Sequence, residues 1–318
     1  MKFLMENLLK ELKRNLDCKC MMERKLMVKF QGGLGNQLYE YAFCEWLKQQ
    51  CPDYDVLADL SYYKIRSAHG EMGIWNIFSN IDIEVASNWD IIKHSGQIPI
   101  MYGGKGADRL NALRIKINDR LFNKRENAYW TEISNTDTLE VIDALNSGLR
   151  YFDGYWQNID YFKGNIEGLR NKLKFPKECD KYITDEMLRD NAVSLHVRRG
   201  DYVGSEYEKE VGLSYYKKAV EYVQDRVDQA KFFIFSDDKS YAETAFEWID
   251  NKTVVAGYDN ELAHVDMLLM SRMKNNIIAN STFSLWAAYL NDSMNPLIVY
   301  PDVESLDKKT FSDWNGIK

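Results

Sequence analysis

The sequence lacks an excess of positive charge and any long hydrophobic run. Its 41 basic residues against 48 acidic ones give a net charge of −7, which argues against a nucleic acid as the main partner and leaves room for a local basic site that binds a small anion. No apolar run approaches the roughly 18 residues that cross a bilayer. We therefore expect no integral membrane segment.

Cysteine, histidine and proline are also scarce. The five cysteines are odd in number and scattered, without the paired spacing of a zinc site or a disulfide framework, so we expect reduced thiols and a cytoplasmic protein. None of the four histidines belongs to an HExxH motif, and no GxSxG motif occurs, so zinc hydrolases and the usual α/β-hydrolases have no support. Binding and transfer chemistry remain.

The length predicts two domains, because 318 residues exceed the roughly 150 of a single domain. Residues 1–25 carry leucines at helical spacing and are net basic, which predicts an amphipathic helical extension. It packs on the protein or a partner chain, or makes weak peripheral contact with the inner face of a membrane. We place the two domains at 26–175 and 176–318, with the option that the last helix packs back on the first domain.

The hydrophobic pattern predicts an α/β fold with parallel sheets. Residues 26–30 form a short apolar run that leads through the glycine-rich turn 31–37 into a helical pattern, the opening unit of a doubly wound domain. In the second half, apolar runs alternate with helical patterns as crossover connections require. The predicted strands are 55–60, 192–197, 231–235 and 276–279, and the predicted helices are 215–223 and 240–249.

Arg198 and Arg199 leave the predicted strand 192–197 at its carboxyl end, within the run His196-Val197-Arg198-Arg199-Gly200-Asp201-Tyr202. Open α/β sheets bind their ligands at this edge. The planar fork of an arginine matches two phosphate oxygens at once, so this motif can hold a pyrophosphate. The alternative is an arginine–aspartate ion pair that stabilises a turn.

The other two strand ends carry acids and hydroxyls. Asp237 follows Ser236 at the end of strand 231–235, and either residue can cap the next helix. A carboxylate here can instead accept two hydrogen bonds from guanine. The segment Asn280-Ser281-Thr282-Phe283-Ser284 leads into a helix, whose open N–H groups form a phosphate cradle unless Asn280 or Ser281 caps them.

Two patterns associated with nucleotides and metals fail. A GxGxxG fingerprint would require glycine where the chain has Leu38, so the turn at Gly32 is not a dinucleotide motif. Asp53-Tyr54-Asp55 spells DxD, yet it lies in a polar turn that follows a proline, which favours a solvated turn. We expect no metal site.

Several motifs, in order along the chain, resemble those of the bacterial alpha-1,2-fucosyltransferase family. The resemblance runs from about Met27 to Tyr300, and its His-x-Arg-Arg-x-Asp motif is shared with alpha-1,6- and O-fucosyltransferases. It implies a GT-B fold, with two facing Rossmann-like domains and GDP-fucose held mainly by the second. The motifs are Gly32-Gly33-Leu34-Gly35-Asn36-Gln37, Asp153-Gly154-Tyr155-Trp156-Gln157 with Tyr161-Phe162, the run from His196 to Tyr202, Ser214 to Ala219, Phe235 to Asp238, and Asn280 to Leu290.

The resemblance also implies roles for single residues. Arg198 would hold the β-phosphate, His196 the ribose or guanine side, and Asp237 the guanine. Asn36 would face the donor from the other domain, and Asp201 is a candidate base, or a residue that orients Arg198. Ser281, Thr282 and Phe283 would lie along the pyrophosphate, and Gly35, Gln37, Tyr155 and Gln157 would lie on the acceptor side. The family usually has Met-Phe-Gln at 38–40, so Glu40 would add a charge near the acceptor.

The expected reaction is transfer of L-fucose from GDP-β-L-fucose to the 2-hydroxyl of a galactose-terminated oligosaccharide, with inversion and without metal or cofactor. Arg198 and the helix N-terminus at Ser281 would stabilise the leaving group. Alternatives are a fucosyltransferase of another linkage, a transferase for another GDP-sugar, and a carbohydrate- or nucleotide-binding protein without catalysis.

Overall fold

The computed structural model describes residues 24–64, 73–95, 130–131, 136–255, 262–306 and 313–318. The chain forms two parallel sheets, one from each half of the sequence. Residues 1–23 of the predicted extension lie outside the described residues, as do Cys18 and Cys20. Among the described residues, no helix has the length and hydropathy to cross a membrane.

The first half contains the following helices and strands: β1 (Lys25–Lys29), α2 (Leu34–Gln50), β2 (Asp55–Asp59), η1 (Ser61–Lys64), α3 (Ile74–Ile77), β3 (Glu84–Val85), α4 (Asn88–Ser95), β4 (Trp130–Thr131), α6 (Thr138–Asn146), β5 (Tyr151–Asp153), η3 (Ile159–Tyr161), η4 (Lys163–Asn165) and α7 (Ile166–Lys172). The second half contains η5 (Lys177–Tyr182), β6 (Ala192–Val197), η6 (Gly200–Tyr202), α8 (Glu206–Glu210), α9 (Leu213–Gln224), β7 (Lys231–Ser236), α10 (Lys239–Ala245), β8 (Lys252–Val254), α11 (Ala263–Arg272), β9 (Asn275–Ile277), α12 (Thr282–Tyr289), β10 (Ile298–Pro301) and β11 (Asn315–Ile317).

The first sheet has the order β3-β2-β1-β5-β4, and each pair of neighbours runs parallel. The three middle residues of β1 are buried, as expected for a strand covered on both faces. The turn after β1 places Gly32 at φ +76°, a conformation that glycine adopts without strain, and the chain then enters α2. This turn therefore sets where α2 begins at the carboxyl edge of the sheet.

The second sheet has the order β11-β10-β9-β6-β7-β8, also parallel throughout. All six residues of β6 are buried, and the strand matches its predicted bounds. Helix α10 ends at Ala245 rather than at 249, because Phe246 turns into the core and Lys252 Nζ binds the carbonyl oxygens of Glu247 and Ile249. The α/β fold with two parallel sheets is confirmed.

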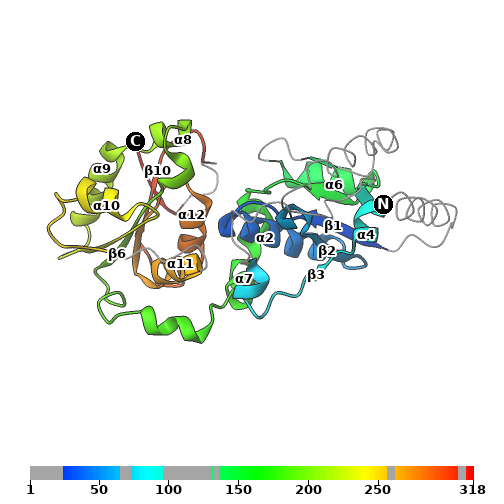
Figure 1. Ribbon diagram of the computed structural model, residues 1–318, viewed down its shortest axis with the longest axis horizontal. Coiled ribbons are helices and arrows are strands. Elements are labelled where there is room, and N and C mark those ends of the chain that lie inside the picture. The colour runs from blue at the N-terminus through cyan, green and yellow to red at the C-terminus, as the bar shows by residue number, and fades with distance from the viewer. Residues whose placement is uncertain (1–23, 65–72, 96–129, 132–135, 256–261, 307–312) are drawn as a thin grey trace.

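Helices α2 and α12 lie side by side between the two lobes (Figure 1). Tyr39 of α2 packs edge-on against Trp286 of α12 at 5.3 Å between ring centroids. Arg170 of α7 closes the other end of α12 by donating to the carbonyl oxygens of Tyr289 at 2.9 Å and Asn291 at 2.7 Å. The last described helix thus packs on the first half of the chain, and the packing brings two helix N-termini together.

Candidate active site

The N-terminal turns of α2 and α12 meet at Gly35. A Cβ atom added to Gly35 would lie 2.6 Å from the carbonyl carbon and Oγ1 of Thr282 and 2.7 Å from the backbone nitrogen of Phe283. Neither helix carries a side-chain cap, since the N-cap residues Gly33 and Ser281 make no capping hydrogen bond. The open N–H groups and positive ends of two helices therefore lie at one place, on either side of the domain contact.

Asn36 joins the two domains at this contact. Its Oδ1 accepts a hydrogen bond from Gln157 Nε2 at 3.1 Å and another from Thr282 Oγ1 at 3.1 Å. The three residues are far apart in the chain and come from α2, the segment after β5, and α12. The side chain of Asn36 is half-buried, so the amide still reaches the surface of the site.

The buried Glu40 anchors the glycine-rich turn. The backbone N–H of Gln31 donates to both carboxylate oxygens of Glu40, at 3.1 and 3.0 Å, and Glu40 is fully buried. Glu40 therefore anchors the turn, and a charge near the acceptor stays a prediction. Gln37 is buried as well, with Oε1 accepting from the N–H of Ile74 at 3.0 Å and Nε2 donating to the carbonyl oxygen of Gly32 at 3.4 Å.

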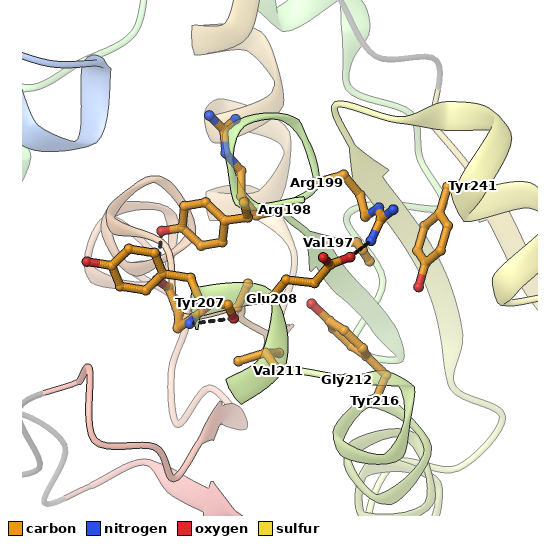
Figure 2. Close-up of a pocket in the computed structure, with 12 residues that line it drawn as sticks. Val197, Arg198, Arg199, Tyr207, Glu208, Val211, Gly212, Tyr216 and Tyr241 are labelled. Carbon is orange, nitrogen blue, oxygen red and sulfur yellow. Dashed lines mark hydrogen bonds and ion pairs between the residues drawn. The ribbon is translucent and has the colours of Figure 1, made fainter. Parts of the chain in front are cut away.

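The two arginines that follow β6 point in different directions (Figure 2). Arg198 donates from a terminal guanidinium nitrogen to Asp237 Oδ2 at 2.8 Å, and both side chains are about one-third exposed. Arg199 forms an ion pair with Glu208 and lies over the ring of Tyr241 at 4.0 Å. Arg198 is therefore the arginine that keeps an accessible charge at the strand end, whereas Arg199 is held within the protein.

A cavity of about 120 Å³ surrounds the Arg199–Glu208 pair (Figure 2). Ligand pockets usually exceed about 300 Å³, so this cavity alone is too small for a nucleotide. It separates the loop that carries Arg198 from helices α9 and α10. The cavity is lined by Val197, Arg198, Arg199, Tyr202, Tyr207, Glu208, Val211, Gly212, Tyr216, Tyr241, Ala279 and Asn280.

The cap of α10 is Asp238, and the expectation that Ser236 or Asp237 caps this helix is wrong. Asp238 Oδ1 accepts from the N–H of Tyr241 at 3.0 Å. Asp237 instead accepts the N–H of Arg199 at 2.8 Å and the guanidinium of Arg198. Asp237 therefore accepts hydrogen bonds at the strand end, and helix capping does not explain why an acid stands at this position.

The alternative that Asn280 or Ser281 caps α12 through its side chain is also wrong. Asn280 Nδ2 donates to the carbonyl oxygen of Tyr207 at 3.2 Å and to Glu210 at 3.1 Å, away from the helix. Ser281 holds the N-cap position without a side-chain cap. The N-terminus of α12 is left open to a ligand.

His196 lies buried beside this N-terminus. Its ring centroid is 5.6 Å from that of Phe283, and its Nδ1 is buried without a hydrogen-bond partner among the described residues. Burial, and next the charge of Arg198, lower the pKa of His196 to about 3. The imidazole is therefore neutral at physiological pH, with one buried ring nitrogen that has no described hydrogen-bond partner.

Sequence reasoning missed Asp266, on the first turn of α11. This helix follows β8, so it begins at the same carboxyl edge of the second sheet. Burial raises the pKa of Asp266 to about 7, and its Oδ1 has no hydrogen-bond partner among the described residues. The signal in the sequence is a single acid inside the apolar run Val265-Asp266-Met267-Leu268-Leu269.

Other predicted residues are dispersed or outside the described part. The side chain of Asp201 lies outside the described residues. Tyr155 is 41% exposed. Asp53 of the DxD pattern pairs with Arg24 at 3.1 Å on the surface. Within the described ranges, no group of three or more histidines, cysteines and acids could hold a metal ion, and Cys44, Cys51 and Cys179 are free thiols.

The sequence profile of glycosyl transferase family 11 matches residues 25–318. The chain belongs to this family. Within the curated proteins, it is 28% identical over 290 residues to the O-antigen biosynthesis glycosyltransferase WbnK of Escherichia coli, covering 85% of this chain and 91% of the relative. It is 30% identical over 287 residues to an alpha-1,2-colitosyltransferase of Escherichia coli, covering 84% and 88%.

A solved structure supports the fold of this family 11 member. The alpha-1,6-fucosyltransferase NodZ, in a crystal soaked with GDP-fucose, superposes with a TM-score of 0.51 at 15% identity, covering 89% of this chain and 96% of NodZ. At that identity the likeness shows the GT-B fold alone. Membership of family 11 makes the protein a glycosyltransferase of a fucosyltransferase-like family, which implies a nucleotide-sugar donor and a glycan acceptor.

Proposed function

We propose that the protein transfers L-fucose from GDP-β-L-fucose to the 2-hydroxyl of a terminal β-galactose, with inversion to an α linkage. The observation that carries the proposal is the meeting of two uncapped helix N-termini next to the strand end that bears Arg198. Two helix N-termini and an arginine at the neighbouring strand end supply positive potential, which suits the pyrophosphate of a nucleotide sugar.

The chemistry needs stabilisation of the leaving group above all. As the anomeric bond breaks, positive charge builds on the sugar and negative charge builds on the β-phosphate. Arg198 and the N-terminus of α12 would bind that negative charge as it develops, and preorganised groups of this kind usually supply the largest part of catalysis. Asp237 orients Arg198 by accepting a hydrogen bond from its guanidinium at 2.8 Å. No metal or cofactor enters this scheme.

Two carboxylates suit the guanine end of the donor. Asp237 has its two oxygens engaged by Arg198 and the N–H of Arg199, whereas Asp266 has a buried oxygen without a described partner. A carboxylate that accepts from the N1–H and exocyclic amine of guanine regains hydrogen bonds and is favoured in its charged form. We assign the guanine to Asp237, with Asp266 as a further acceptor at the same edge of the sheet and His196 on the ribose or guanine side.

The acceptor is proposed to enter from the first domain, past Tyr155. Asp201 is the proposed base for the galactose hydroxyl, or the residue that orients Arg198, and the departing phosphate is the other proton acceptor available. A pH profile of Asp201→Asn separates these roles. Loss of the acidic limb of the profile supports a base, whereas a uniform fall in kcat supports an orienting role.

A second donor is favoured by the 30% identity to an alpha-1,2-colitosyltransferase. The same site would then transfer colitose from its GDP-activated form to form the same linkage. The deciding experiment incubates the protein with each GDP-sugar and a panel of β-galactosides in EDTA, followed by linkage analysis by NMR. We expect an α-1,2-fucosylated galactoside at a rate that EDTA leaves unchanged. Another linkage, or transfer of colitose alone, would reject the fucosyl assignment.

A further inference from the structure

Gln157 and Thr282 surround one oxygen of Asn36, and this arrangement fixes which way the Asn36 amide faces. An amide oxygen has two lone pairs. Both are occupied, one by Gln157 Nε2 and one by Thr282 Oγ1, each at 3.1 Å. Turning the amide over would set its NH₂ group against the NH₂ group of Gln157, and the Thr282 hydroxyl would have to accept instead of donate.

The NH₂ group of Asn36 is left as a donor. Among the described residues, Nδ2 has no hydrogen-bond partner, and the side chain is half-buried at the domain contact. A Cβ atom on Gly32 would lie 2.5 Å from Nδ2, so the bare Cα of Gly32 leaves the space that this nitrogen occupies. The glycine at this position, at φ +76°, serves both the turn and the amide.

We propose that Gln157 and Thr282 are positioning residues that present the Asn36 amide as a hydrogen-bond donor to the β-phosphate of the nucleotide sugar. This inference rests on the proposed function, because it takes a nucleoside diphosphate as the leaving group. The electrostatics of the contact support an anion, since the uncapped N-termini of α2 and α12 lie there. Gln157, assigned to the acceptor side by sequence, is thereby assigned to the donor.

The arrangement also couples the two domains to the chemistry. Asn36 and Gln157 belong to the first half of the chain and Thr282 to the second, 246 positions from Asn36. The Thr282 hydroxyl reaches Asn36 only while α2 and α12 are in contact. The amide is therefore fully oriented only when the domains are closed on each other.

The experiment is a double-mutant cycle with two readouts, the GDP dissociation constant by calorimetry and kcat for transfer. Asn36→Asp removes the NH₂ donor and places a negative charge toward the phosphate. Thr282→Val removes the hydroxyl at nearly constant shape, and Thr282→Ser keeps it as the matched control. Gln157→Glu replaces the donor by an oxygen and turns the Asn36 amide over.

We expect Thr282→Val and Gln157→Glu each to weaken GDP binding and lower kcat about tenfold, the loss typical of a hydrogen bond to a charged group. Thr282→Ser, which keeps the hydroxyl, should restore most of the GDP affinity and kcat that Thr282→Val loses, and KM for the acceptor should stay unchanged in all variants. In the Asn36→Asp background, Thr282→Val should add no further loss, because the two residues act as one unit.

If the losses in GDP affinity and kcat multiply in the Asn36→Asp, Thr282→Val double variant, the proposal is overturned, because Thr282 would then contact the ligand on its own. Equal losses in Thr282→Val and Thr282→Ser would overturn it as well, since a hydroxyl donor would not be the cause. The proposed function fails in a different way, when the wild-type protein binds GDP but transfers no fucose, and the GDP readout then still decides the role of the amide.

Discussion

Gly35 offers the sharpest test of the domain contact, because replacing it by alanine should raise helix stability and reduce activity together. Alanine is favoured over glycine within a helix by up to about 1 kcal/mol, and α2 is a 17-residue helix. The added Cβ, however, would lie 2.6 Å from backbone and side-chain atoms of Thr282, where ordinary contact begins at 3.4 Å. The two helices must therefore move apart by about 0.8 Å or more.

The expected size of the effect follows from that displacement. A misplacement of about 1 Å can reduce the rate roughly 10²-fold, and moving α12 away also separates Thr282 from Asn36. We expect kcat/KM of Gly35→Ala to fall by about two orders of magnitude. We expect the thermal midpoint to change little, because the helix gain offsets the looser contact between Tyr39 and Trp286.

The assay pairs steady-state kinetics at varied donor concentration with differential scanning calorimetry. Gly164→Ala is the matched control, since a Cβ there meets nothing within 4 Å and the residue lies in η4, away from the contact. Wild-type kcat/KM in Gly35→Ala would refute the close approach as a requirement of activity. An equal loss in Gly164→Ala would assign the effect to glycine replacement in general.

Two further predictions address the donor site. Arg198→Ala should lower kcat about 10²- to 10³-fold at saturating donor while the far-ultraviolet circular dichroism stays unchanged, and turnover within threefold of the wild type would contradict a leaving-group role. Asp266→Asn should stabilise the protein more at pH 8.5 than at pH 5 in urea unfolding. The folded pKa, raised to about 7 from 3.8, keeps a proton on the wild-type group that the unfolded chain releases. The stability this proton provides is lost as pH rises toward 7, by about 3 kcal/mol between pH 5 and 7 at 1.36 kcal/mol per pH unit, and an equal gain at both pH values would contradict it.

The strands of the second sheet could be predicted from sequence because burial on both faces leaves a continuous apolar run. Ala192–Val197 is such a run, and all six residues are buried. The cap of α10 could not be assigned in the same way. Ser236, Asp237 and Asp238 all suit an N-cap by type, and only the direction of the chain after β7 selects Asp238.

The contact around Asn36 could not be predicted, since its partners are 121 and 246 positions away. Sequence reasoning treats glycine as the sign of a turn, which is correct for Gly32 at φ +76°. Gly35 lies inside a helix, and glycine is needed there because Thr282 of the other domain leaves no room for a Cβ atom. A residue selected by a neighbour so distant in the chain leaves no local pattern.

The groups described at this contact stabilise negative charge, and none of them is a base at physiological pH. His196 is neutral with a pKa of about 3, which makes it too weak to hold a proton from a sugar hydroxyl. The Asn36 amide has no basicity, its oxygen is filled by Gln157 and Thr282, and Arg198 is a permanent cation. The acceptor proton must therefore leave through a carboxylate outside the contact, for which Asp201 is the candidate, or through the departing phosphate. If the departing phosphate takes the proton, the same group carries the developing negative charge and accepts the proton. A variant that weakens the stabilisation of that charge should then also shift the pH dependence of transfer.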